Sequence, residues 1–352
     1  MALTSPEGRP PGARSPQDEP DAGGLATFRS PLWLPGGNLQ TIWAARLAVK
    51  HQGPAPVFRR ERWDTPDGDF IDVDFAFEDA PQPGGGTCEP KPLLVLFHGL
   101  EGSSNGHYSL AVADEARRRG WAYAVPHFRG CSGELNRAPR AYHSGDFEEI
   151  AWILARLRAR ALASLWVVGI SLGGNALMRW AAEAGTAASA LARAVVSVCS
   201  PLDLAAAGQA IDRGFNRLVY ARMFLATMKP KALAKLAQHP GLFDGQRLRQ
   251  ARTLWEFDDV FTGPLHGFAG TDDYWARASA LPHLHRIQIP ALALNARNDP
   301  FIPACSLAQP GQAGRVELWQ PPDGGHVGFA AGAPPGHLRV MPRAVLDWLS
   351  RH

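Results

Sequence analysis

The sequence predicts an α/β fold, with a mostly parallel central sheet and helices on both of its faces. Apolar, β-branched runs alternate with helix-forming runs from about residue 92 to residue 199. These runs are continuous in apolar residues, which is typical of parallel strands that are buried on both faces. The alternation stops near residue 202 and an apolar run returns near residue 290, which indicates an inserted helical segment.

Composition excludes several other classes of protein. The chain has 352 residues, of which 45% are hydrophobic and 20% charged, so a large core can form. Its 36 basic and 33 acidic residues are too evenly balanced for a dedicated nucleic-acid binder. The four cysteines are far apart and form no CxxC pair, so no metal site, cofactor or disulfide is indicated. Without a signal pattern or a membrane-spanning apolar run, we expect a cytoplasmic protein.

The amino-terminal part of the chain predicts a tail, a short helix and a hairpin. Residues 1–26 are rich in Pro, Gly, Ser and charge, so we expect a disordered tail before a single domain over 27–352. A short helix is expected from about Asn38. Segments 57–63 and 70–77 flank Asp67-Gly68 and predict a β-hairpin. Asp72 and Asp74 alternate with apolar residues, so we expect one face of this hairpin to be solvated.

Further strands and helices follow from the apolar runs and from helix-forming composition. Strands are expected over 92–97, 121–126, 165–169, 194–199, 290–295 and 316–319. Helices are expected over 107–119, 146–160, 172–184 and 341–351. Residues from about 202 to 287 lack a convincing strand pattern, so we expect a helical cap over the carboxyl edge of the sheet.

The motif Gly169-Ile170-Ser171-Leu172-Gly173 lies between a predicted strand and a predicted helix. A serine on such a tight turn has a strained backbone and an exposed hydroxyl, and strand and helix pass so closely that small flanking residues are required. We therefore predict that Ser171 is a nucleophile. Ser171 could instead merely cap the helix, but capping does not require the glycines around it.

An acid and a histidine follow in the chain order used by Ser–His hydrolases of this architecture. Asp299 comes directly after a late strand, and His326 lies in a glycine-flanked loop. We predict that His326 accepts the serine proton and that Asp299 orients the imidazole. The backbone N–H groups of Leu100 and Leu172 are the predicted oxyanion hole.

Other titratable residues near these loops are weaker candidates. Asp323 is a rival acid, but it lies close to His326 in sequence and is typical of a turn. His98 is interpreted as a brace for its loop rather than a catalytic group. A catalytic role for His143 or Asp146 is possible, although Asp146 is also a natural first-turn acid of a helix.

The expected cap contains a segment, 213–225, that mixes apolar and aromatic residues with arginines. It could form a basic amphipathic surface that contacts a membrane. Alternatively, its apolar face packs inward and its arginines face water, which is the interpretation we favour.

Several stretches together resemble one branch of a known superfamily. They are Asn38–Thr41, His98–Ser104, Phe128–Arg137, Tyr142–Asp146, Gly169–Asn175, Phe261–Phe268, Asn298–Phe301 and Gly324–Phe329. The chain resembles the YheT-like branch of the α/β-hydrolase superfamily from about Phe28 onward. This resemblance implies an α/β-hydrolase fold, a carboxylic-ester hydrolase and the same Ser171, Asp299 and His326 triad. It also implies that relatives act on acylglycerols or phospholipids.

Three functional hypotheses follow. The first is a serine hydrolase that cleaves short- or medium-chain or lipid-derived esters through an acyl-enzyme, with no nucleic-acid partner. The second is an amidase or peptidase, which would need an amine-recognising acid cluster in the cap, drawn from Asp258, Asp259, Asp272 and Asp273. The third is a non-catalytic binding protein of the same fold.

Overall fold

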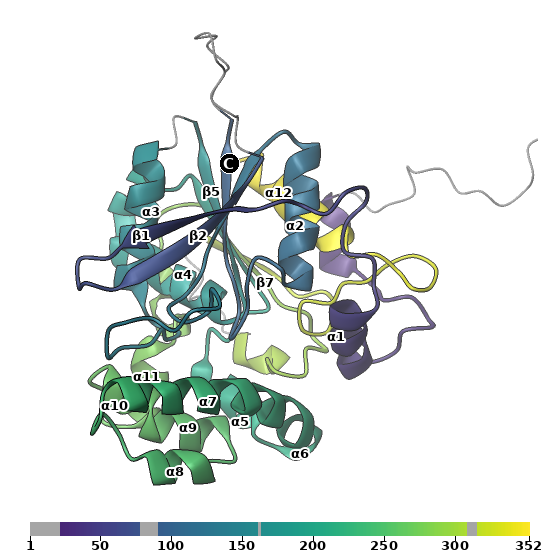
Figure 1. Ribbon diagram of the computed structural model, residues 1–352. Helices are drawn as coiled ribbons and strands as arrows, with labels where there is room; N and C mark the ends of the chain where they lie inside the picture. Colours follow the sequence, from purple (N-terminus) through teal and green to yellow (C-terminus); the bar gives the residue numbers. More distant parts are fainter. Residues whose placement is uncertain (1–21, 78–90, 161–162, 308–314) are drawn as a thin grey trace, which may run out of the picture.

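The chain forms an eight-stranded sheet in the order β1-β2-β4-β3-β5-β6-β7-β8 (Figure 1). The computed structural model describes residues 22–77, 91–160, 163–307 and 315–352. The strands are β1 (Arg59–Asp64), β2 (Phe70–Ala76), β3 (Leu93–Phe97), β4 (Ala122–Pro126), β5 (Leu165–Ile170), β6 (Ala194–Val198), β7 (Ala291–Leu294) and β8 (Val316–Trp319). β2 is antiparallel to β1 and β4, and the remaining pairs are parallel. The predicted α/β class with a mostly parallel sheet is confirmed.

Helices cover both faces of the sheet. Side chains of a strand alternate between the two faces. In β3, Leu94 and Leu96 share a core with α2 (His107–Arg118) and α12 (Val340–Leu349), whereas Val95 and Phe97 share one with α3 (Phe147–Arg160) and α4 (Leu172–Ala184). Because both faces of the sheet are buried, the sequences of the central strands are unbroken runs of apolar residues.

The predicted hairpin forms, but its expected solvated face is wrong. Every residue of β2 is buried, including Asp72 and Asp74. The guanidinium of Arg62 donates to Asp72 at 2.8 and 2.9 Å, and that of Arg60 donates to Asp74 at 2.7 and 2.9 Å. The two carboxylates are therefore hydrogen-bonded by arginines of β1, and not by solvent as the alternating pattern predicted.

The folded chain begins earlier than the predicted boundary at residue 26. Residues 1–21 of the expected tail lie outside the described residues. The 3₁₀ helix η1 (Ala22–Thr27) follows, and Leu25 is 1% exposed in the core that also contains α12. Phe28 then packs edge-on against Phe329 at 5.9 Å. Leu25 and Phe28 therefore attach this segment to the domain, although the residues before it have the composition of a disordered tail.

A layer of helices lies across the carboxyl ends of the strands (Figure 1). We call residues 204–286 the cap. It contains α5 (Leu204–Ile211), α6 (Gly214–Asn216), the π turn η3 (Arg217–Ala221), α7 (Arg222–Gln238), α8 (Gly245–Gln250), α9 (Leu254–Val260), α10 (Thr262–Leu265), α11 (Thr271–Ala278) and the 3₁₀ helix η4 (Leu281–Arg286). As the sequence predicts, no strand interrupts it between β6 and β7, a stretch that the structure describes in full.

The remaining elements are α1 (Gly37–Arg46) and the 3₁₀ helices η2 (Gly185–Ala190) and η5 (Ala304–Leu307). In the described part of the chain, no helix has the length and apolar character needed to cross a membrane.

Candidate active site

Ser171 forms the turn between β5 and α4. Its backbone has φ 51° and ψ −121°, a conformation that is strained for any residue with a side chain. Its side chain makes no capping hydrogen bond to α4, so the capping interpretation is wrong. A methyl group at Gly169 would lie 2.5 Å from the Gly174 Cα, and one at Gly174 would lie 1.9 Å from the Ser200 hydroxyl. The glycines are therefore required for the close passage of strand and helix.

The structure brings the three predicted triad residues together. His326 Nε2 lies 3.1 Å from Ser171 Oγ, and His326 Nδ1 lies 2.9 Å from Asp299 Oδ2. The second carboxylate oxygen, Oδ1, accepts backbone N–H groups of Phe301 and Ile302 at 2.8 and 3.3 Å. A carboxylate held in this way fixes the imidazole with Nε2 facing the serine hydroxyl.

The two predicted oxyanion donors adjoin Ser171. A Cβ at Gly99 would lie 3.2 Å from the Ser171 Cβ, so the loop after β3 touches the serine. The N–H groups of Gly99 and Glu101 each donate to a buried tyrosine hydroxyl at 3.0 Å. Among the described residues, the N–H groups of Leu100 and Leu172 have no such acceptor. Both can therefore donate to a substrate oxygen.

The helix α1 supplies supports for the triad to which the sequence pattern assigns no role. The Thr41 hydroxyl accepts the His326 N–H at 2.8 Å. Gln40 Oε1 accepts both the Gly324 N–H at 2.8 Å and the Asn298 side-chain N–H at 2.9 Å. Both positions fall in the stretch Asn38–Thr41 that carries the family resemblance. That match is the only sequence signal for them.

Cys199 supports the histidine loop from the other side. It follows β6 with φ 49°, and its buried thiol lies 3.3 Å from the Val327 nitrogen and 3.7 Å from the Gly325 oxygen. Burial holds the pKa of this thiol well above its usual range. Cys199, Asp299 and His326 are the one group of possible metal ligands within reach of a single ion in the described chain. Asp299 and His326 already bond to each other, so we assign them to the triad.

His98 has the bracing role that the sequence predicts. Its Nε2 accepts the Phe128 N–H at 3.1 Å and its Nδ1 lies 2.8 Å from the Gly99 carbonyl, to which it donates. Burial lowers the pKa of His98 to about 3, so the ring is neutral and joins the loops after β3 and β4.

The weaker candidates do not contact the triad. Asp146 accepts the Glu149 N–H in the first turn of α3 and pairs with Arg140. His143 lines the cavity, but its Nδ1 accepts the Gly145 N–H. Asp323 accepts the Ser30 N–H and an Asn298 side-chain N–H. The structure thus places Asp299, and not Asp323, beside His326.

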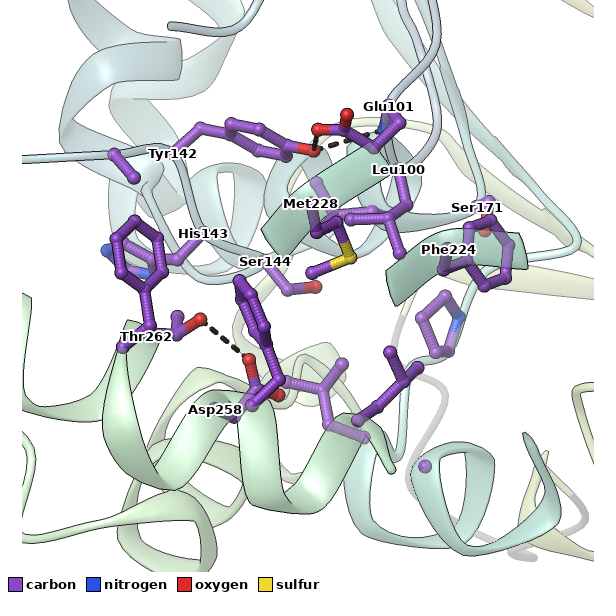
Figure 2. Close-up of a pocket in the computed structure, with 18 of the residues that line it drawn as sticks. Leu100, Glu101, Tyr142, His143, Ser144, Ser171, Phe224, Met228, Asp258 and Thr262 are labelled. Atoms are coloured by element: carbon purple, nitrogen blue, oxygen red, sulfur yellow. Dashed lines mark hydrogen bonds between the residues drawn. The ribbon is translucent and has the colours of Figure 1, made fainter. Parts of the chain in front are cut away.

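A cavity that is open to solvent lies between the sheet and the cap, and its empty space, with the open mouth included, amounts to about 1150 Å³. Figure 2 shows Ser171 and Leu100 on one side of this cavity and Asp258 with Thr262 opposite them. Its cap wall is largely apolar and includes Leu204, Ile211, Phe224, Met228, Phe257 and Phe261.

Polar groups in the cavity wall are paired. Lys231 Nζ lies 2.8 Å from Glu101 Oε2, which links α7 to the loop after β3. Asp258 accepts from the Thr262 hydroxyl at 2.6 Å and from the Trp275 indole at 2.9 Å. Burial raises the pKa of Asp258 to about 6.

Comparison with known proteins agrees with this architecture. Residues 92–333 match the family model described as "alpha/beta hydrolase fold", and the chain is 39% identical over 296 residues to "Putative esterase YheT" of Escherichia coli (strain K12), spanning 83% of this chain and 84% of that protein. The chain therefore belongs to the α/β-hydrolase family and, within it, to the YheT-like branch.

More distant matches extend the comparison. "Phospholipase ABHD3" of Homo sapiens is 27% identical over 90% of this chain and 77% of its own. A solved membrane phospholipase A superposes with a TM-score of 0.51 at 16% identity over 90% of both chains, which shows a common fold.

Proposed function

We propose that this protein is a serine hydrolase that cleaves carboxylic esters through an acyl-enzyme. The observation that carries the proposal is the hydrogen-bonded chain from Ser171 through His326 to Asp299 beneath an apolar cavity. Ser171 Oγ attacks the ester carbonyl and its proton passes to His326 Nε2. The N–H groups of Leu100 and Leu172 stabilise the oxyanion. The imidazolium then protonates the leaving alkoxide, and water releases the acid by the same steps in reverse.

The cavity supports an acyl substrate. Its apolar cap wall can bury a short or medium hydrocarbon chain, and each buried methylene contributes about 0.8 kcal/mol. The names of the relatives, an esterase and a phospholipase, point to the same chemistry. We therefore propose acyl esters, including lipid-derived ones, as the substrate class.

An amidase or peptidase is less well supported, because the four cap acids do not form a cluster. Asp259 pairs with Arg247, and Asp273 pairs with Arg277. Asp272 accepts from the Trp255 indole. Asp258 alone lines the cavity, and it is already hydrogen-bonded. Asp259, Asp272 and Asp273 do not line the cavity, so none of the four offers a free carboxylate to an amine bound there.

A non-catalytic binding protein is also disfavoured, because the triad is complete and correctly hydrogen-bonded. As for location, we propose the cytoplasm, since the buried thiols of Cys131 and Cys199 are free. Cell fractionation would test this assignment.

The test is hydrolysis of p-nitrophenyl esters from acetyl to palmitoyl by the wild-type protein and by Ser171→Ala. We expect activity that the substitution abolishes, with a chain-length optimum set by the cavity. A phosphonate probe should label wild type and not the variant. A folded wild-type protein that neither hydrolyses any ester nor reacts with the probe would contradict the proposal.

A further inference from the structure

The helix that runs from α6 through the π turn into α7 is apolar on two opposite sides. Its inner side buries Tyr220, Ala221 and Leu225. Its outer side exposes Phe215, Leu218, Val219 and Met223, and Leu218 is 72% exposed. The inward-packing interpretation that the sequence favoured is therefore wrong for these four residues. These four apolar side chains are exposed to solvent, whereas apolar residues on a helix usually pack against the rest of the domain.

The helix α1 lies beside the π turn and also carries exposed apolar side chains. The Tyr220 hydroxyl lies 3.0 Å from Asn38 Oδ1, which places the start of α1 beside the π turn. Leu39 and Ile42 of α1 are also exposed. We call Leu39, Ile42, Phe215, Leu218, Val219 and Met223 the docking face. An apolar face of this kind on a soluble domain marks an interaction surface.

Basic residues flank the docking face. Arg213 directly precedes α6, and Arg217 and Arg222 follow it at intervals of four and five residues; all three are exposed. Within the described residues, none of these three guanidinium groups lies within 4 Å of a carboxylate, although Arg217 attracts the Asp212 carboxylate at longer range. A helix with an apolar stripe and unpaired arginines beside it has the composition of an interfacial helix, whose apolar side chains enter the acyl region while its cations contact anionic head groups.

The docking face is built on the same elements that hold the active site. The Tyr220 ring packs against Phe301 at 4.6 Å, and Phe301 packs against His326 at 4.3 Å. Phe224 and Met228 of α7 line the cavity from the inner side. A partner seated on the outer side would therefore lie close to the triad and to the acyl cavity.

From these observations we infer that the docking face binds the surface of an anionic lipid bilayer. The apolar side chains enter the bilayer surface, and the three arginines contact its phosphates. Delivery of an ester from the bilayer to Ser171 rests on the proposed function, whereas binding to the bilayer does not.

The test is flotation of the 352-residue Ser171→Ala protein with vesicles of phosphatidylcholine, with and without phosphatidylglycerol. This variant leaves the lipids intact. We expect binding that requires phosphatidylglycerol and weakens at high salt. Leu218→Asp should lower the partition coefficient about tenfold or more, because it places a charge in the inserted side. Each arginine changed to Gln at 213, 217 and 222 should lower it about fivefold.

The matched control is Val57→Asp. Val57 is 85% exposed and precedes β1, which runs parallel to β4, so it lies at the edge of the sheet opposite the cap. This substitution should leave vesicle binding unchanged. Equal losses in Leu218→Asp and Val57→Asp would overturn the proposal, as would a protein that never floats with anionic vesicles.

Two further measurements separate this inference from the proposed function. Hydrolysis of a water-soluble ester by otherwise wild-type protein should survive Leu218→Asp, whereas hydrolysis of a vesicle-borne ester should fall. Light scattering tests whether a second copy of the chain occupies the docking face instead. If the protein does not bind vesicles but forms a dimer that Leu218→Asp dissociates, the docking face is a dimer interface and the membrane proposal is overturned. Ester hydrolysis would remain intact in that case.

Discussion

At the scale of single residues, the choice of acid beside His326 has a direct consequence. Asp299→Asn keeps the shape of the side chain but removes the charge that stabilises the imidazolium. We expect the turnover number for a soluble ester to fall by about 10⁴, as is typical of this change in serine hydrolases. Steady-state kinetics on a soluble ester would measure it.

The rival acid provides the control for this experiment. Asp323 bonds to Ser30 and Asn298 and has no bond to the imidazole. Asp323→Asn should retain activity within about tenfold, since it disturbs only a loop hydrogen bond. A larger loss in Asp323→Asn than in Asp299→Asn would reverse the assignment of the acid.

Thr41 offers a second test at this scale. Thr41→Val keeps the shape of the side chain and removes the hydroxyl that accepts the His326 N–H. A lost buried hydrogen bond costs about 1–3 kcal/mol. Because Thr41 positions the histidine and does not touch substrate, we expect kcat to fall about tenfold with KM little changed. Thr41→Ser keeps the hydroxyl and should restore kcat. A change in KM alone would show that Thr41 acts on substrate binding instead.

At the scale of elements, the β5–α4 turn depends on the absence of a side chain. In Gly169→Ala the new methyl group would meet backbone atoms of Gly173 and Gly174 at 2.5–2.7 Å. Overpacking against backbone should lower the free energy of unfolding by about 3 kcal/mol and displace Ser171, so activity should fall as well. Urea denaturation and ester hydrolysis would measure the two effects.

Gly185 is the matched control for that turn. It has φ 52° and open space around it, so Gly185→Ala introduces backbone strain without a clash. We expect a loss of about 1–3 kcal/mol and full activity, because Gly185 lies at the far end of α4 from Ser171. Gly169 lies in β5 without a positive φ, so a cost at this position must come from close packing. Normal stability and activity in Gly169→Ala would contradict that explanation.

The elements differ in how well the sequence predicts them. The parallel strands are predictable because each carries its signal within one apolar run, and the nucleophile turn is predictable because Gly169 and Gly173 must flank Ser171. The burial of Asp72 and Asp74 is not predictable from the sequence. Their partners Arg62 and Arg60 lie on another strand, and the register in which the two strands pair determines which arginine meets which aspartate. Gln40 and Thr41 escape prediction for the same reason: their partners lie more than 250 residues away.

At the scale of the whole molecule, Asp258 links stability to pH. Burial raises its pKa to about 6, above the ordinary value near 3.9. The folded protein therefore binds this proton more tightly than the unfolded chain, and stability falls as pH rises from about 4 to about 7. Asp258→Asn removes this pH-dependent contribution to the free energy of unfolding. The stability difference between wild type and variant should change by about 2 kcal/mol between pH 4.5 and pH 7.5 in urea unfolding. An unchanged difference would mean that Asp258 titrates normally.

The contacts of α1 also bear on the order in which the molecule is completed during its synthesis. Gln40 and Gly324 are 284 residues apart, and Thr41 and His326 are 285 apart. The polar side chains of α1 can therefore find these partners only after the distant loop around His326 has been synthesised. A nascent chain can therefore build strands β1 to β7 while the Ser171–His326–Asp299 site is still unassembled, so this site can form only after the loop around His326 has left the ribosome.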